Sequence, residues 1–471
     1  MIQIIRGAGG GRFHLPSPAI ILFLCALLCA VPGAVFAETR KLSLDEAVDL
    51  AIKNNLSLES ARVASSTKKR AADTAWNVFI PTVDLSATLG RMNRIGDATV
   101  TTWFGGAPQF MTIETDEGNH WSLSGNLAIS FNFNFALFES MKNLKLNYQA
   151  GLISFEKARV QLERDIRKTY FQLLLLQDQR GLLQDQITMA ERRVETAQAN
   201  YRAGLVPELT LLQAQVSLAN IKPNMVELEN GIKSSIAVFA MNLGLPSGTE
   251  IELEPAQMPG VVELDAAALI SRAASEKPDI EELRQNILVI QSARKARFYQ
   301  AFTPNLSLGW NMDPTVRNPW TGDGWSNGVW SSSGLFRVTL SYSLNNLFPF
   351  GSARQGLADM DDNLRSLNIA LAQTIRGTEV EIYSTILKLE KSQTSLEVLR
   401  QNANLAERSA SLTEQAYRAG LQDLLTLQAS QSELTNARFA VVQEEYNYMM
   451  NLIDLEYTIG VPFKTLSGSI R

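Results

Sequence analysis

The chain has 471 residues, a formal net charge of −5, two cysteines and two histidines. Its acidic balance argues against a nucleic-acid partner. Cys25, Cys29 and His14 all lie in the first 37 residues, so the chain beyond that segment has His120 as its only histidine and no thiol. One histidine and no cysteine are a poor basis for a zinc site or a histidine-dependent triad, and we expect neither an enzyme nor a bound metal or cofactor.

Residues 1–37 are interpreted as a secretory signal peptide. Arg6 and Arg12 give a positive start, "AIILFLCALLCAV" is an apolar run, and "VFA" fits a small-residue cleavage site. An uncleaved membrane anchor is the alternative, but its apolar core is short and is broken by Pro32. A lipid anchor at Cys29 is a second alternative. Beyond this segment no run of 18 apolar residues follows, so a chain that crosses a membrane would have to do so as a closed barrel.

Four segments alternate apolar and polar residues as amphipathic strands do: "PTVDLSATLG", "WSLSGNLAISFNFNF", "NLSLGWNM" and "FRVTLSYSLN". We expect strands at about 80–90, 121–137, 304–312 and 335–345. A soluble sandwich would alternate in the same way. However, all seven tryptophans lie in or beside these segments, as in the aromatic girdle of a membrane barrel. The polar faces would then line a water-filled lumen, with Asp84, Ser86, Asn126, Asn132, Arg337 and Thr339 as lumen-facing candidates.

A barrel needs about eight strands or more, and this chain offers only four, so it must associate. A dimer would give a side-chain-filled barrel and a trimer an open lumen. The apolar strand faces would contact lipid. The loops at 91–120 and 313–333 are expected outside the cell, because membrane barrels place their longer loops there.

The sequence contains an internal repeat. The tetrapeptide Tyr-Arg-Ala-Gly ends at Gly204 and again at Gly420, and the "LGLP" and "IGVP" glycines, Gly244 and Gly460, repeat the same offset of 216 residues. We therefore divide the chain into a first repeat at 38–261 and a second at 262–471. Each would hold two strands and a long helical hairpin, at about 139–243 and 351–460.

The helical hairpins are predicted to form long coiled coils. No proline occurs between Glu139 and Asn200, a stretch that makes a rod of about 90 Å. The return helix of the first repeat carries a heptad-like seam, which Pro223 should kink or locally interrupt. The seam residues are Leu211, Ala214, Leu218, Ile221, Met225, Leu228, Ile232 and Phe239.

Each hairpin turns at a glycine that suits a left-handed helix end, Gly204 or Gly420. Pro207 and Asp423 are suited to start the returning helices. Two near-copies of this turn, both far from the strands, suggest a surface that a partner recognises.

The two "YRAGL" tips, the "LGLP" and "IGVP" closings and the start "LSLDEAVDLAIKNN" resemble the TolC-type outer membrane efflux proteins, also called outer membrane factors. The resemblance covers nearly the whole chain after residue 37. It implies a mostly helical homotrimer with a twelve-stranded barrel in the outer membrane, surrounded by lipid, and an α-helical tunnel in the periplasm. A periplasmic adaptor protein and an inner membrane pump, of RND or ABC type, would dock at the tips. The duct would then conduct cargo passively in efflux or type I secretion.

The resemblance also implies roles for residues at the tips. The adaptor contacts would be Arg202, Ala203, Gly204, Leu205, Arg418, Ala419, Gly420 and Leu421. The tunnel gate candidates are Tyr201, Glu208, Thr210, Tyr417, Gln422, Asp423 and Thr426.

Tyr417 matches a tyrosine that helps to hold the family's tunnel closed. Gln422 and Thr210 stand where the family has a charged pair, and Thr426 and Ala429 stand where it has acidic residues at the tunnel entrance. The gate therefore cannot use the same charged links. We hypothesise instead that Arg202 or Arg418 pairs with Glu208 or Asp423 across neighbouring tips. The alternative to a channel is a periplasmic coiled-coil scaffold without a pore. The cargo, the particular pump and the choice among drug efflux, metal export and protein secretion stay open.

Overall fold

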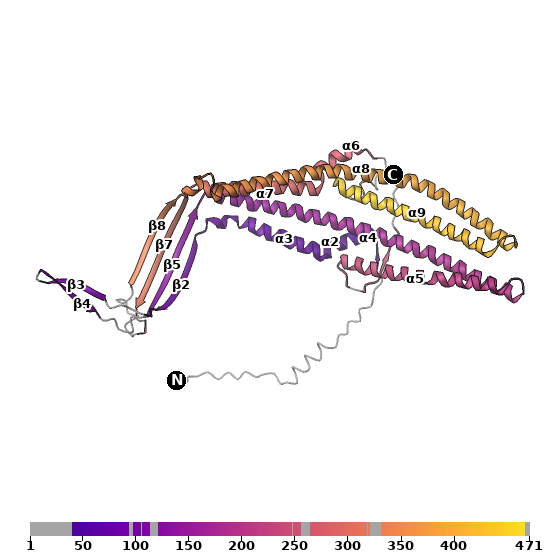
Figure 1. The fold of residues 1–471 in the computed structure, drawn as a ribbon, viewed down its shortest axis with the longest axis horizontal. Helices are drawn as coiled ribbons and strands as arrows, with labels where there is room; N and C mark the ends of the chain where they lie inside the picture. The colour runs from indigo at the N-terminus through magenta and orange to yellow at the C-terminus, as the bar shows by residue number, and fades with distance from the viewer. Residues whose placement is uncertain are drawn as a thin grey trace, which may run out of the picture.

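The computed structural model describes residues 40–93, 98–104, 106–113, 121–246, 248–255, 264–317, 319–320 and 331–466. The proposed signal peptide and His120 lie outside these residues. The molecule is long and thin, with a β-sheet at one end and two helical hairpins that run to the other end (Figure 1).

The sheet has four antiparallel strands in the order β2-β5-β7-β8. The strands are β2 (Thr82–Arg91), β5 (Trp121–Phe133), β7 (Asn305–Arg317) and β8 (Ser331–Ser341). Each sequence repeat supplies one neighbouring pair, and β2 and β8 form the two free edges. All four expected strands are present, as two adjacent pairs of one sheet.

Some expected strand ends and loops differ from the structure. β7 runs to Arg317 and β8 starts at Ser331, because Asp313, Pro314 and Thr315 pair with β8 where a loop was expected. β5 stops at Phe133, because the Asn134 side chain accepts the Ala136 N–H at 2.8 Å and starts the next helix.

The loop expected at 91–120 contains a two-stranded hairpin that the sequence reading missed. Strands β3 (Ala98–Phe104) and β4 (Ala107–Ile113) pair with each other and turn at Gly106, whose φ is 85°. In Figure 1 this hairpin projects away from the sheet, on the side opposite to the helices.

The helical part repeats one arrangement. The first repeat contributes α2 (Leu44–Asn54), α3 (Leu56–Asp73), α4 (Ala136–Arg202) and α5 (Glu208–Asn242). The second contributes α6 (Ala266–Glu276), α7 (Pro278–Phe302), α8 (Ser352–Arg418) and α9 (Leu424–Ile459). Both α4 and α8 have 67 residues. The described residues also include two short 3-10 helices, η1 (Ala75–Phe79) and η4 (Leu344–Leu347), and the parallel strand pair β1 (Arg40–Leu42) with β6 (Ile251–Leu253).

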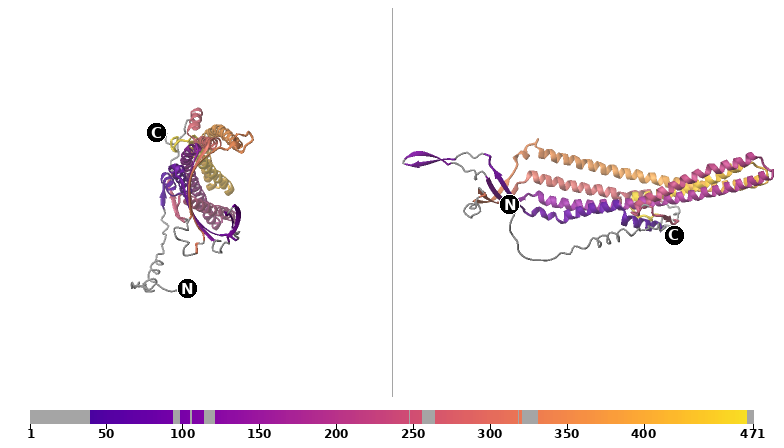
Figure 2. Two further views of the ribbon diagram at one scale, coloured as in Figure 1. Left: turned by 90° about the vertical axis from the view of Figure 1, so that its left-hand side faces the viewer. Right: turned by 90° about the horizontal axis from the view of Figure 1, so that it is seen from below.

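The helices form a single curved layer rather than a closed bundle. Near the sheet the contacts run α3 to α4, α4 to α7 and α7 to α8; near the tips they run α5 to α4, α4 to α9 and α9 to α8. The end-on view in Figure 2 shows this open, curved cross-section. One copy of the chain therefore leaves free edges in its helical layer as well as in its sheet.

The expected seam of α5 is present. All eight seam residues are buried or half-buried, and they face the hairpin partner α4. Pro223 lies inside α5 but does not end the helix, which continues to Asn242. Pro223 is exposed on the side away from the seam, so the missing N–H and the ring cause no buried clash.

The main core lies at mid-length, where the short helices and the β1–β6 pair cover the long helices. Its largest buried side chains include Tyr170, Phe171, Phe239 and Leu455. The Tyr170 hydroxyl links β1 to the end of β6. It lies 3.0 Å from the Leu42 carbonyl oxygen and 2.7 Å from the Glu254 carbonyl oxygen. No helix in the described ranges has an apolar stretch long enough to span a membrane.

Candidate functional site: the polar sheet face and the helical tips

The register of the sheet separates its residues into two faces. One row joins Asn132, Ser307 and Thr339, and another joins Ser130, Gly309 and Arg337. Ser86 pairs with Asn126, and Asp84 lies two residues from Ser86 on the same face. The six lumen-facing candidates therefore share one polar face.

The opposite face is apolar and exposed. One row across all four strands consists of Val83, Ile129, Trp310 and Phe336. Phe336 is 65% exposed, and Leu85 on the same face is 82% exposed. Exposing apolar side chains on all four strands to water is costly, so this face requires contact with lipid or with another apolar surface.

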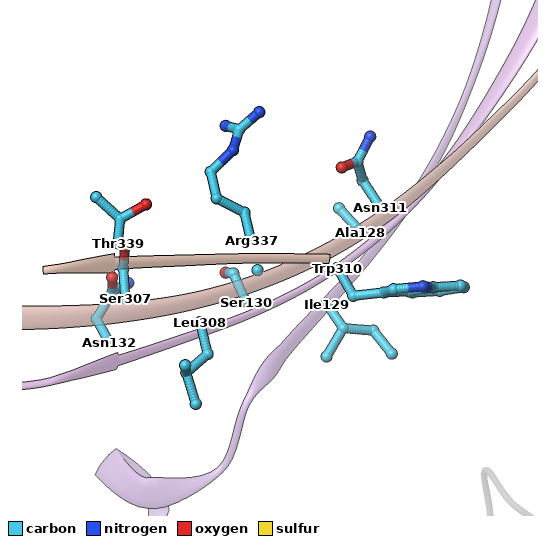
Figure 3. A pocket seen from close by; sticks show the side chains of 11 residues that line it. Ala128, Ile129, Ser130, Asn132, Ser307, Leu308, Trp310, Asn311, Arg337 and Thr339 are labelled. Carbon is cyan, nitrogen blue, oxygen red and sulfur yellow. The ribbon is translucent and has the colours of Figure 1, made fainter. Parts of the chain in front are cut away.

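Figure 3 shows the two faces directly. The side chains of Arg337, Thr339 and Asn311 project to one side of the strands, and those of Leu308 and Ile129 project to the other. A shallow hollow of about 300 Å³ opens beside Arg337, over Gly309, where the strand has no side chain. The polar face thus carries a guanidinium group bordered by amides and hydroxyls.

Asp313 belongs to this polar face and was not among the candidates. Asn126 and Asn311 donate their side-chain amides to its two carboxylate oxygens. The period-two alternation continues through Asp313 to Arg317, and this was the available signal. Pro314 hid it, because proline usually ends a strand.

The two helical tips have the same backbone geometry. In the first tip the Gly204 N–H donates to the Tyr201 carbonyl at 2.9 Å, and the Leu205 N–H to the Asn200 carbonyl at 2.8 Å. Gly420 and Leu421 make the corresponding bonds in the second tip, at 2.9 and 2.8 Å. Both glycines have a φ of 73°. This double bond pattern is the Schellman motif, which explains why both tips need glycine.

The returning helices begin differently. The Asp423 carboxylate accepts the Thr426 N–H at 2.8 Å. Hydrogen bonds from the Thr426 side chain and backbone lower the pKa of Asp423 below its ordinary value. Pro207 has no capping side chain, and its carbonyl accepts the Thr210 N–H at 3.1 Å. Asp423 is therefore engaged as a helix cap.

Among the described residues of one chain, neither tip arginine pairs with Glu208 or Asp423. In the described residues Arg418 pairs with Glu414, one turn earlier on α8, rather than with Glu208 or Asp423. An i,i+4 pair on one helix forms without bringing two tips together, and Asp423 is already occupied. A pair between tips of different copies stays a hypothesis.

The tip leucines have similar surroundings, whereas the tip tyrosines do not. Leu205 and Leu421 are both exposed, at 73% and 78%. Tyr201 is exposed as well, whereas Tyr417 is half-buried against a small apolar cluster of Ala197, Leu211, Ala214 and Leu424. Of the two tyrosines, only Tyr417 joins the two hairpins of one chain. The other gate candidates, Glu208, Gln422 and Thr426, are exposed, and Thr210 is half-buried.

Arg193 is a tip residue that the sequence reading missed. It lies on α4, half-buried, and burial lowers the pKa of its guanidinium, an effect that the nearby Tyr417 phenol opposes. Its Nε donates to the Met189 carbonyl on its own helix at 3.2 Å. No sequence signal marked it, because an arginine on a long helix is usually solvated.

A family model described as "Outer membrane efflux protein" matches residues 47–238 and 269–461. The chain therefore belongs to the outer membrane efflux protein family, and the two matched segments are its two structural repeats. Its place is the outer membrane of the cell, with the long helices forming the periplasmic part, as the resemblance implied. No group of three or more metal-binding side chains occurs among the described residues.

Among curated proteins, the chain is similar to the pyoverdine export outer membrane protein OpmQ of Pseudomonas aeruginosa. The two are 23% identical over 446 residues, which cover 90% of this chain and 85% of OpmQ.

Two solved structures share the fold. The CmeC outer membrane channel of Campylobacter jejuni matches with a TM-score of 0.70 at 16% identity, covering 88% of this chain and 85% of CmeC. The open state of the MtrE outer membrane channel of Neisseria gonorrhoeae matches with a TM-score of 0.67 at 16% identity, covering 89% of each chain. The expected fold, a repeat of two strands and long helices, is thus confirmed.

Proposed function

We propose that this protein is the outer membrane channel of a tripartite export system. Three copies would enclose a duct that conducts cargo passively from a periplasmic adaptor and an inner membrane pump to the exterior. The observation that carries the proposal is the four-stranded sheet with one polar face, one exposed apolar face and two unpaired edges.

The sheet argues for closure by further copies. Free edges of β2 and β8 expose unpaired N–H and C=O groups, which cannot be left in lipid. Antiparallel pairing of β8 with β2 of the next copy continues the alternation of the sheet. Three copies provide twelve strands, with the polar faces inside and residues such as Leu85 and Phe336 against lipid.

The helices have matching free edges. α8 exposes Val398, Leu405 and Leu412 at seven-residue spacing, at 60%, 58% and 65%. α5, at the other edge of the layer near the tips, exposes Val216 and Val226, at 57% and 58%. Such stripes pack well in a coiled coil between neighbouring copies, and closing the layer in this way produces a tunnel.

The exposed tips support the docking of the adaptor. Leu205 and Leu421 are exposed and lie in the turns that join α4 to α5 and α8 to α9. Figure 1 shows these turns at the far end from the sheet. Energy for transport would come from the pump, since the duct needs only to open. The OpmQ likeness favours export of a small molecule over secretion of a protein.

A pore-free coiled-coil scaffold is the competing function. It would leave the apolar sheet face without a cover, so the structure favours the channel. The direct test is to reconstitute the purified full-length protein in planar lipid bilayers. Discrete conductance steps are expected; protein that stays in the soluble fraction and never produces steps would overturn the proposal.

A further inference from the structure

The two middle helices of the layer carry an excess of positive charge where they approach the sheet. Close to the sheet the helices lie in the order α3, α4, α7, α8, so α4 and α7 are not at a free edge (Figure 2). Residues 136–149 of α4 and 290–302 of α7 contain five basic side chains and one carboxylate, Glu139. The whole chain, in contrast, has a formal net charge of −5. The basic residues are Lys142, Lys145, Arg294, Lys295 and Arg297.

The carboxylate and one of the arginines are already engaged. The Glu139 carboxylate accepts a hydrogen bond from the Ser292 hydroxyl at 3.2 Å. Arg294 pairs with Asp361 of α8, with Nη2 2.8 Å from a carboxylate oxygen. Three lysines are exposed and form no ion pair within the described part of the chain, namely Lys142, Lys145 and Lys295.

The two lysines of α4 lie on the side of the layer that continues the apolar sheet face. The Phe138 ring is 6.1 Å from the ring of Phe133, which belongs to the apolar face of β5. Phe138 is itself 54% exposed. Lys142 and Lys145 follow Phe138 by four and seven residues, a spacing that keeps side chains on one side of a helix. Both lysines therefore lie on the outer side of the layer, one and two turns further from the sheet.

Lys295 lies on the outer side of α7. The inner side of this helix is marked by Arg297 and Gln300, which border a hollow together with Asn132 of the polar sheet face. Lys295 is two residues from Arg297 and five from Gln300, so a helix of about 3.6 residues per turn places it on the opposite side. Phe298, 44% exposed, is one turn from Lys295 on that outer side.

Arg354 of α8 adds a fourth positive charge. Its guanidinium carbon lies 5.7 Å from the centre of the Phe302 ring, and that ring stacks on Phe298 at 5.2 Å. Asp359 and Asp362 are exposed on the same helix, so the positive excess is greatest on α4 and α7 and smaller at α8. We call Lys142, Lys145, Lys295 and Arg354 the basic collar.

The basic collar begins at the level where the apolar sheet face ends. The Ser292 hydroxyl also donates to the Glu139 carbonyl at 3.2 Å, and this antiparallel register puts Lys295 level with the start of α4. At a rise of about 1.5 Å per residue, Lys142 and Lys145 lie about 9 and 14 Å further from the sheet. A headgroup layer is about 5–7 Å thick, and long lysine side chains can extend toward it. The upper part of the collar is thus within reach of lipid headgroups.

We propose that the basic collar binds the phosphate groups of anionic phospholipids in the membrane leaflet that faces the periplasm. With the apolar sheet face in the hydrocarbon layer, the headgroups of that leaflet surround the collar and carry the opposite charge. Lysine and arginine attract an anionic lipid surface over about one Debye length, roughly 8 Å at physiological salt. The collar would thereby select the lipids around the barrel. The inference rests on the proposed channel, because it requires the sheet to lie in the membrane.

The experiment measures which lipids the protein holds at its surface. Protein purified from the outer membrane fraction is reconstituted in phosphatidylcholine bilayers with a trace of spin-labelled phosphatidylglycerol or spin-labelled phosphatidylcholine. The wild type should immobilise phosphatidylglycerol about two-fold or more over phosphatidylcholine, and about 1 M salt should remove this preference. Lys142→Gln, Lys145→Gln and Lys295→Gln in combination should bring the ratio close to that of phosphatidylcholine alone. The three corresponding changes to arginine keep the charge and should keep the preference.

Two controls separate the collar from positive charge in general. Lys388→Gln with Lys391→Gln and Arg408→Gln removes three positive charges from exposed positions of α8 far from the sheet, and should leave the preference unchanged. Arg297→Gln removes one charge from the inner side of α7 and should have less effect than Lys295→Gln on the outer side.

Conductance in planar bilayers keeps the inference apart from the proposed function. The collar variant should show the same conductance steps as the wild type, because the collar lies outside the lumen. A conducting collar variant that keeps the wild-type lipid preference, or a distal variant that loses as much of it, would overturn the inference while the channel stands. Wild-type protein that never enters bilayers would instead overturn the proposed function.

Discussion

Gly460 lies against the backbone of Glu276: a Cβ atom on Gly460 would come within 2.7 Å of the Glu276 carbonyl oxygen. Gly244 has the same relationship to Asn54, at 2.5 Å. Each glycine ends the last long helix of its repeat, and each contacts the junction between the two short helices of the same repeat. The sequence repeat thus corresponds to a repeated three-dimensional contact.

Replacing either glycine should destabilise the protein. Both have a positive φ, 70° for Gly244 and 75° for Gly460, and the new Cβ would clash with backbone. We expect Gly244→Ala and Gly460→Ala each to cost about 2 kcal/mol or more. The midpoint of thermal unfolding in detergent measures this. Gly231→Ala, in the exposed middle of α5 with open space around it, is the control and should stabilise slightly.

Tyr170 should make the mid-length core sensitive to alkali. Burial raises the pKa of Tyr170 to about 12, so the folded protein favours the neutral hydroxyl more than the unfolded chain does. Its contribution to stability is complete below pH 10 and is lost as the pH rises from about 10 to 12. Tyr170→Phe should lower stability by about 1–2 kcal/mol at neutral pH, because the one hydroxyl donor that two backbone carbonyls share is lost.

The check is urea unfolding followed across pH 8 to 12. The wild type should lose more stability than Tyr170→Phe over the upper part of that range. Tyr201→Phe, at an exposed tip position, should match the wild type throughout. Parallel pH curves for wild type and Tyr170→Phe would contradict this assignment.

The polar sheet face should govern ion preference in the pore. Arg337 and Asp84 carry opposite charges at the two edges of this face. Arg337→Ala should shift selectivity toward cations, and Asp84→Asn should shift it toward anions. Reversal potentials under a salt gradient measure both shifts. If both variants keep the wild-type potential, these side chains do not line the conducting path.

The tip leucines should be needed for docking and not for assembly. Leu205→Asp combined with Leu421→Asp replaces two exposed apolar side chains with charged ones and should abolish crosslinking of the channel to the proposed periplasmic adaptor in whole cells. Leu56→Asp, at an equally exposed leucine far from the tips, is the matched control. A tip variant that still forms crosslinked complexes at the wild-type level would exclude these leucines from the docking surface.

Local pattern was enough for much of this fold. Alternation in "WSLSGNLAISFNFNF" identified β5, and the repeated "YRAGL" identified both tips with their left-handed glycines. The predicted end of β7 was wrong, because strand pairing outweighs the local preference of proline to end a strand. Pro314 continues β7 because both flanking strands pair with the residues around it.

The contacts between the two hairpins could not be predicted from the sequence. Asp178 and Tyr446 are far apart in the chain, and each is an ordinary residue on a long helix. Only the register between α4 and α9 brings them together, with the Tyr446 hydroxyl 2.9 Å from the Asp178 carboxylate. The Arg418–Glu414 pair was not predicted either, because an arginine near a turn can pair with a carboxylate one turn away on its own helix as well as with one on another helix.

The central claim is that three copies close one barrel and one tunnel. The most direct measurement is the detergent-corrected mass of the protein extracted from the outer membrane fraction. We expect three times the mass of one chain, in agreement with twelve strands around an open lumen. A monomer recovered from the soluble periplasmic fraction would contradict the account and would leave the coiled-coil scaffold as the better explanation.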